Sequence, residues 1–179
     1  MVIFFTGHRP PRLGGFDPAN EIAAWSRAAL TRAVARALAT GDVTRWITGG
    51  ALYTDQWAAQ AVLDQGDGAR LTVARPFPSQ QNMWPPEVQD AYMLLLESVW
   101  DAGGDVLDVS QDPFTAEKMM LRDHWMVDQA TCGIAVWDGG AGGTGHTIAY
   151  ARKKSLPFYH INPQTRRCAW EKPPSVTSG

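Results

Sequence analysis

Residues 137–154 read WDGGAGGTGHTIAYARKK, and they connect two different kinds of segment. The apolar, β-prone run CGIAVWD (132–138) comes before them, and a helix is expected over 144–154. Five glycines fall within the seven residues 139–145, where the strand gives way to the helix. A strand that passes through a glycine turn into a helix is the repeating unit of α/β proteins. Backbone N–H groups in such a turn can also surround a phosphate, so the segment predicts both an architecture and a ligand site.

The same alternation of strand and helix continues on both sides of this segment. Gly and Pro separate the segments from one another. Further strands are expected at 2–6, 43–48, 69–77, 105–110 and 156–161, and helices at 20–39, 54–65, around the run AYMLLL (91–96) and at 115–130. Asn20 and Thr115 are candidate caps of two of these helices. The strands are apolar runs, as sheets covered on both faces require. The pattern predicts an α/β fold with a Rossmann-like, mostly parallel six-stranded sheet and helices on both faces.

Length and composition limit the class of protein. The 179 residues suit a single domain, expected over 1–162, with a polar, Pro-rich and flexible tail over 163–179. A net charge of −2 argues against a protein that coats nucleic acid with its whole surface. Two cysteines without zinc or disulfide spacing, and the lack of a signal peptide or long apolar run, predict a cytoplasmic protein that does not contact membranes. No metal site and no cofactor are predicted.

Ligands of open α/β sheets bind beyond the carboxyl ends of the strands, so the turns after the strands hold the candidate residues. After the first strand, Thr6 can hydrogen-bond, His8 can act as an acid or base, and Arg9 can pair with a phosphate. After the second strand, Asp55 either caps the next helix or binds a ribose hydroxyl. The full set of candidate binding residues is Thr6, Gly7, His8, Arg9, Gly49, Gly50, Ala51, Asp55, Arg122, Asp138, Gly139, Gly140, Gly142, Gly143 and Thr144.

Arg122 belongs to this set because the helix over 115–130 runs antiparallel to the fifth strand, and its first half returns to the ligand edge. Arg122 then reaches a phosphate or, alternatively, forms a surface ion pair. We expect the phosphate on residues 140–144 with help from Arg9 or Arg122, and the base and ribose near Thr6, Gly49, Gly50 and Asp55. Candidate catalytic residues are Arg122, Asp55 and His8.

Four segments together resemble the SLOG superfamily, which joins DprA/SMF proteins to the LOG phosphoribohydrolases. They are TGHRP (6–10), TGGALYTDQWAA (48–59), MLRDHWMVDQA (120–130) and WDGGAGGTGHTIAYARKKSLPFYHI (137–161). The resemblance spans about residues 1–162 and is closest to the YpsA-like branch of bacteria and phages. It implies a Rossmann-like fold that binds nucleotides or nucleotide-derived ligands. LOG enzymes use an Arg, matched by Arg122, and a Glu, whose position is occupied by Thr147.

A threonine cannot supply the carboxylate that this hydrolysis requires. The sequence therefore favours a nucleotide-binding protein of the sensor or sequestering type. The alternative is an N-glycoside hydrolase acting on nucleoside phosphates or ADP-ribose-type ligands, with Asp55, Asp123 or Asp138 as the relocated carboxylate. A DprA-like protein associated with nucleic acid is less favoured, because concentrated basic runs are few. Eight tryptophans leave assembly into a homo-oligomer open.

Overall fold

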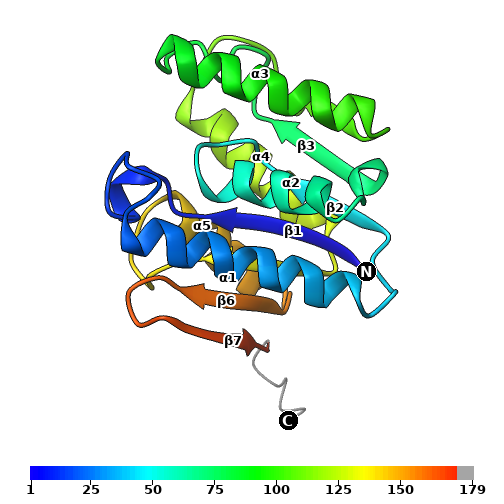
Figure 1. The fold of residues 1–179 in the computed structure, drawn as a ribbon, viewed down its shortest axis with the longest axis vertical. Coiled ribbons are helices and arrows are strands. Elements are labelled where there is room, and N and C mark those ends of the chain that lie inside the picture. The colour runs from blue at the N-terminus through cyan, green and yellow to red at the C-terminus, as the bar shows by residue number, and fades with distance from the viewer. Residues whose placement is uncertain (173–179) are drawn as a thin grey trace.

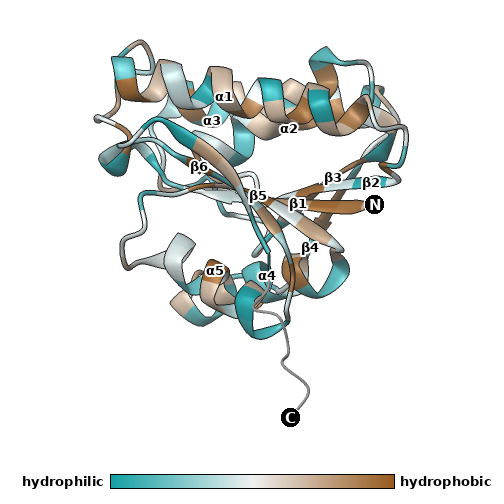
Figure 2. Ribbon diagram, turned by 90° about the horizontal axis from the view of Figure 1, so that it is seen from below, coloured by the Kyte–Doolittle hydropathy of each residue, from teal (hydrophilic) through white to brown (hydrophobic). Residues whose placement is uncertain are grey.

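The computed structural model describes residues 1–172 and contains three layers (Figure 2). A central seven-stranded sheet has the order β4-β3-β2-β1-β5-β6-β7. One face is covered by α1, α2 and α3, and the other by α4 and α5. The strands are β1 (Val2–Gly7), β2 (Arg45–Thr48), β3 (Leu71–Arg75), β4 (Asp105–Asp108), β5 (Cys132–Val136), β6 (Phe158–Asn162) and β7 (Arg167–Glu171). The helices are α1 (Glu21–Leu38), α2 (Thr54–Asp64), α3 (Pro86–Asp101), α4 (Ala116–Gln129) and α5 (Gly143–Lys153), with short 3-10 turns η1 (Pro10–Arg12) and η2 (Gly68–Arg70).

The predicted Rossmann-like α/β fold is confirmed, and β1 to β6 are all parallel to one another. The sheet differs from the prediction by one strand. β7 pairs antiparallel with β6 where the sequence predicted a loose tail. Its sequence RCAWE is largely exposed and lacks an apolar run, but Glu171 binds Arg152 and His160 at 2.6 and 2.7 Å and ties the strand to the domain. The rest of the predicted tail, residues 173–179, lies outside the described residues.

The strand order reverses at β1, which lies between β2 and β5. In Figure 1, β2 and β3 lie on one side of β1, and β6 and β7 lie on the other. Chain order proceeds outward from β1 to β4 and then crosses to β5 on the opposite side. The register pairs Thr6 with Ala135 and Gly7 with Val136, so β1 and β5 end at the same level. Such a reversal leaves a crevice at the carboxyl edge, because the two turns diverge to opposite faces of the sheet.

Helix starts follow the residues that the sequence suggested. The Asn20 side chain accepts hydrogen bonds from the N–H groups of Ile22 and Ala23, both 3.0 Å long, and begins α1. Thr115 caps α4 by accepting from the N–H of Lys118 at 3.2 Å. These bonds satisfy N–H groups that have no partner within the helix.

The central strands are buried on both faces, which explains their unbroken apolar sequences. Ile3 and Phe5 pack towards α1 and α2, whereas Phe4 and Ile47 pack towards α4 and α5. Gly133 of β5 leaves room for the Phe4 ring, with which a Cβ would collide. No helix within residues 1–172 is long and apolar enough to cross a membrane.

Candidate functional site

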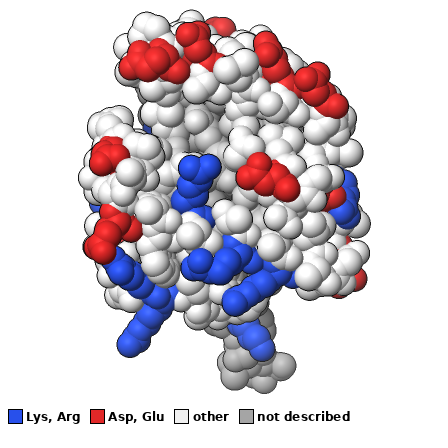
Figure 3. Space-filling view, viewed as in Figure 1, with Lys and Arg blue, Asp and Glu red and all other residues white. Residues whose placement is uncertain are grey.

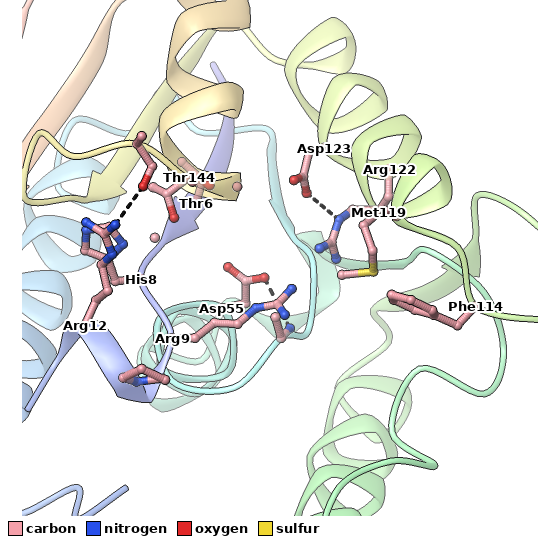
Figure 4. Close-up of a pocket in the computed structure, with 17 residues that line it drawn as sticks. Thr6, His8, Arg9, Arg12, Asp55, Phe114, Met119, Arg122, Asp123 and Thr144 are labelled. Atoms are coloured by element: carbon pink, nitrogen blue, oxygen red, sulfur yellow. Dashed lines mark hydrogen bonds and ion pairs between the residues drawn. The ribbon is translucent and has the colours of Figure 1, made fainter. Parts of the chain in front are cut away.

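A cavity of about 390 Å³ opens at the carboxyl edge of the sheet, where the turns after β1 and β5 meet (Figure 4). Its walls come from the β1 turn and η1, the start of α2, the first half of α4 and the glycine turn before α5. It is lined by Thr6, Gly7, His8, Arg9, Pro11, Arg12, Ala51, Asp55, Phe114, Ala116, Met119, Arg122, Asp123, Ala141, Gly142, Gly143 and Thr144. The cavity thus occupies the crevice that the strand order creates.

Ten of the fifteen predicted binding residues line this cavity. They come from four separated parts of the chain and are Thr6, Gly7, His8, Arg9, Ala51, Asp55, Arg122, Gly142, Gly143 and Thr144. The other five, Gly49, Gly50, Asp138, Gly139 and Gly140, do not line it. These five belong to the same turns and lie close to lining residues in the sequence.

The glycine turn presents the N-terminus of α5 to the cavity. Gly142, the residue before the helix, has φ +132° and forms no side-chain cap. A Cβ at Gly142 or Gly143 would meet nothing within 4 Å, so both backbones face open space. Gly145 lies one turn deeper, where a Cβ would come within 2.7 Å of the Gly140 carbonyl. The turn therefore needs glycine for its conformation at 142 and for close packing at 145.

Asp138 acts behind this turn. Its carboxylate accepts from the backbone N–H of Gly140 at 2.7 Å and from the Arg12 guanidinium at 3.0 Å. Arg12 also donates to the Ala141 carbonyl at 2.9 Å. Burial opposes ionisation, but these bonds outweigh it and lower the pKa of Asp138 to about 2. Asp138 thereby joins η1 to the glycine turn instead of facing the cavity.

His8 connects the β1 turn to the same network. Its Nε2 lies 3.0 Å from the backbone N and 2.8 Å from the Oδ1 of Asp138. Burial lowers its pKa, although the Asp138 carboxylate opposes the shift. The Nε2 atom of the imidazole is occupied by Asp138. This arrangement favours a role for His8 in positioning the turn over a role as an acid or base towards a ligand.

Arg122 lines the cavity from α4, but its guanidinium is only 2% exposed and is already bonded. Its Nε donates to Asp123 Oδ1 at 2.7 Å, and Nη1 donates to the carbonyls of Gly49 and Ala74. Burial alone would lower the pKa of Arg122, but the nearby carboxylates of Asp123 and Asp55 reverse that effect and raise it. Arg122 does not form a surface ion pair, because its side chain is buried, and its hydrogen bonds to the carbonyls of Gly49 and Ala74 join α4 to the ends of β2 and β3. A role as a phosphate ligand stays a prediction.

Asp55 lies beneath this guanidinium and is 7% exposed. Its Oδ2 accepts from the N–H of Ala51 at 3.2 Å, so the side chain closes the turn after β2 and does not cap α2. Burial raises the pKa of Asp55 to about 6, against the opposing effect of Arg122. Asp55 is therefore a carboxyl group that exchanges its proton near neutral pH.

Thr147, which the resemblance sets at the glutamate position of LOG enzymes, is 1% exposed. Its hydroxyl lies 3.2 Å from Asp123 Oδ2 and 3.0 Å from the Gly143 carbonyl. Asp123, one residue after Arg122, lines the cavity beside it. Of the three carboxylates that the sequence offered as substitutes, Asp55 and Asp123 line the cavity, whereas Asp138 does not.

Gly49 and Gly50 are needed for packing. A Cβ on Gly49 would collide with the Arg122 guanidinium and lie 2.7 Å from Asp55 Oδ2. Gly50 has φ +70°, and its Cβ would lie 2.8 Å from the Tyr92 hydroxyl. Protein side chains therefore occupy the space on the Cβ side of both glycines, and neither glycine lines the cavity.

Sequence reasoning missed several lining residues. Arg12 follows Arg9 by three residues in the same turn, so the sequence alone could have identified it as a candidate. Phe114 precedes α4 and Met119 lies in its first turn. Nothing in the sequence distinguishes these two residues from ordinary surface or core residues. Only the packing of α4 against the sheet brings them to the cavity.

Comparisons with known proteins agree with this geometry. The model of the YpsA family, described as the YspA SLOG family, matches residues 3–162. The chain is 28% identical over 126 residues to the uncharacterized SPbeta prophage-derived protein YoqJ of Bacillus subtilis, covering 63% of this chain and 71% of that protein. It is 33% identical over 141 residues to a UPF0398 protein of Brevibacillus brevis, covering 76% and 72%.

A solved structure is similar in fold. DNA processing protein A from Helicobacter pylori, described for its single-stranded DNA binding mode, superposes with a TM-score of 0.59 over 89% of this chain. The identity is 16%, and the match covers 64% of the length of that protein. At this identity the similarity shows the fold alone.

Proposed function

Because this chain belongs to the YpsA family of SLOG proteins, we propose that it binds a nucleotide or nucleotide derivative in the cavity between the β1 and β5 turns, as a sensor or sequestering protein. The phosphate would rest on the start of α5. The ribose would lie towards Thr6 and Asp55, which line the cavity floor.

The observation that carries this proposal is the uncapped start of α5. The first N–H groups of a helix have no partner within it, and no side chain caps this one. Gly142, Gly143 and Thr144 line the cavity, and the helix dipole adds partial positive charge at the same point. An anionic oxygen is the partner that such N–H groups lack.

Two arginines add positive charge at this wall. Arg12 is held towards the turn by Asp138 and the Ala141 carbonyl. Arg9 is exposed, lines the cavity, and has neither an ion pair nor a hydrogen-bonded guanidinium within residues 1–172. Arg9 is therefore the side chain best placed to pair with a phosphate.

A matched pair of variants at the first residue of α5 tests the proposal. Gly143→Pro removes one N–H donor while keeping helical geometry, because proline is tolerated at this helix position. Gly143→Ala adds a side chain of similar direction but keeps the donor. Calorimetry with ribose 5-phosphate and AMP as probes measures the affinity of both variants. Gly143→Pro should bind about tenfold more weakly than wild type, which is the effect of losing one charge-assisted hydrogen bond. Gly143→Ala should bind more tightly than Gly143→Pro. Equal affinity of the two variants, or failure of wild type to bind either probe, contradicts the proposal.

Hydrolysis of an N-glycosidic bond is a second candidate, because two carboxylates line the same cavity. Asp55 has a pKa of about 6, close to neutral pH as a general acid needs, and Asp123 forms an ion pair with Arg122. Chromatography of AMP and NAD incubated with the protein tests this candidate. Release of free base that is lost in Asp123→Asn would convert the proposed binder into an enzyme.

Association with nucleic acid is a third candidate, suggested by the fold similarity to the H. pylori protein. On the face in Figure 3, acidic side chains gather at the end occupied by α3, and Lys and Arg side chains gather towards α1 and the C-terminal strands. Non-specific binding of DNA depends on many such cations together. Single-stranded DNA therefore belongs in the calorimetric panel, and strong salt-dependent binding of DNA without binding of ribose 5-phosphate or AMP would favour this candidate.

A further inference from the structure

A second cavity of about 500 Å³ adjoins the first. Arg9, Ala51, Phe114 and Met119 line both, so the two form one bipartite space. The remaining walls of the second cavity are Leu52, Phe77, Ser79, Gln80, Asn82, Met83 and Trp84, contributed by the turn after β2 and the segment between β3 and α3. No residue of the predicted site except Arg9 and Ala51 reaches it.

The chemistry of the second cavity contrasts with that of the first. The first is bordered by the glycine turn and by charged groups, whereas the second is bordered by aromatic and thioether side chains. Phe114 is 63% exposed and Met83 is 91% exposed, although both are large apolar residues. Flat aromatic rings and methionine side chains are suited to cover the faces of a planar heterocycle.

Gln80 contributes a buried amide to the lining of this cavity, and it is 8% exposed. Its Nε2 donates to the Tyr92 hydroxyl at 3.1 Å, but its Oε1 has no hydrogen-bond partner within residues 1–172. A buried amide oxygen without a partner is unfavourable, and a donor from a ligand relieves that cost. One N–H of the amide is engaged by Tyr92 and the oxygen has no partner, so the group that the Gln80 oxygen lacks is a hydrogen-bond donor.

We propose that the second cavity is a nucleobase subsite, in which Gln80 selects bases with an exocyclic amino group over their oxo counterparts. This inference rests on the proposed function, since the phosphate would occupy the α5 end of the first cavity. The base would extend past Arg9 and Ala51 onto Phe114 and Trp84. An amino group donates to Gln80 Oε1, whereas an oxo group at the same position sets two acceptors against each other.

Two pairs of nucleotides test this contact, because each pair exchanges an exocyclic amino group for an oxo group and changes the adjacent ring nitrogen from an acceptor to an N–H donor. AMP carries an amino group where IMP carries an oxygen, and CMP and UMP differ in the same way. Calorimetry on the wild-type chain should give about tenfold tighter binding for AMP than for IMP, because the amino group forms a buried hydrogen bond where the oxo group meets another acceptor. CMP should bind more tightly than UMP for the same reason. Ribose 5-phosphate, which has no base, should bind more weakly than AMP by at least about tenfold.

Gln80→Met replaces the amide by an apolar side chain of similar length, and it should remove the preference for AMP over IMP while leaving the affinity for ribose 5-phosphate unchanged. Gln81→Met is the matched control. Gln81 Oε1 is also buried without a partner, but Gln81 lines neither cavity. This control should keep the wild-type preference.

The outcomes separate the two proposals. If ribose 5-phosphate binds but AMP binds no better, or if IMP binds as tightly as AMP or more tightly, the base subsite is wrong and the phosphate site stands. If neither ribose 5-phosphate nor any nucleotide binds, the proposed function fails, and the subsite fails with it. Retention of the preference in Gln80→Met would overturn the assignment to Gln80.

Discussion

Replacing Arg122 with methionine should destabilise the whole domain. The guanidinium is 2% exposed and is bonded to Asp123 Oδ1 and to the carbonyls of Gly49 and Ala74, with Asp55 beside it. Methionine has a similar length but leaves two acidic side chains and two carbonyls without this donor. Removing one partner of a buried ion pair costs about 3–5 kcal/mol, because the remaining charge stays buried and uncompensated.

Thermal unfolding measures this loss. At 179 residues, each kcal/mol shifts the melting temperature by about 2–4 °C, so a decrease of about 10 °C is expected at pH 8. At pH 5 the decrease should be smaller, because Asp55, with a pKa of about 6, takes up a proton and needs no counter-charge. Arg36→Met, at an exposed position on α1, is the matched control and should melt within about 1 °C of wild type.

A melting temperature for Arg122→Met within about 2 °C of wild type at pH 8 would refute the reasoning. It would mean that the ion pair contributes nothing and that the guanidinium is available to a ligand. A large decrease of equal size at pH 5 and pH 8 would keep the structural role of Arg122 but contradict the coupling to Asp55.

Three further predictions concern groups around the same site. The folded pKa of Asp55, about 6, lies above its reference value of 3.8, so its contribution to stability is greatest below about pH 4 and is lost as the pH rises through 6. In urea unfolding at a series of pH values, Asp55→Asn should abolish this change of about 3 kcal/mol in the free energy of unfolding. The folded pKa of Asp138, about 2, is depressed, so its contribution to stability is present above about pH 4 and is lost as the pH falls through 2. Asp138→Asn should cost about 2 kcal/mol of stability at pH 7 and should speed hydrogen exchange at the N–H of Gly140. Unchanged exchange would contradict the role of Asp138 in the turn. Gly133→Ala should cost about 1–3 kcal/mol in chemical unfolding, because the new Cβ collides with the Phe4 ring; a variant as stable as wild type would show that the ring moves freely.

The sequence was informative wherever the signal is local. Strands buried on both faces must be apolar along their whole length, and helices of a βα unit must show a cap and an apolar stripe, so six strands and both tested caps could be predicted. β7 escaped because an exposed edge strand needs no apolar run. It is held by its ladder with β6 and by the bonds of Glu171 to Arg152 and His160, which are distant in sequence.

The candidate site divides in the same way. The turns after β1 and β5 were predictable, because parallel strands end at one edge and glycine marks a turn that needs unusual φ values or close packing. The roles of Arg122, Asp138 and Gly49 were not, since a residue type does not reveal whether its partners are a ligand or the protein itself. Their burial and their partners arise from contacts between segments far apart in the chain.

The sequence by itself determined that a glycine turn stands between β5 and α5 in a Rossmann-like sheet, because backbone conformation and hydrophobic periodicity are local properties. Only the tertiary structure decided what that turn faces. Packing of α4 and of the segment before α3 against the sheet placed Phe114 and Gln80 around a second cavity beside it. No spacing along the chain encodes that meeting, because it depends on where whole helices come to rest on the sheet.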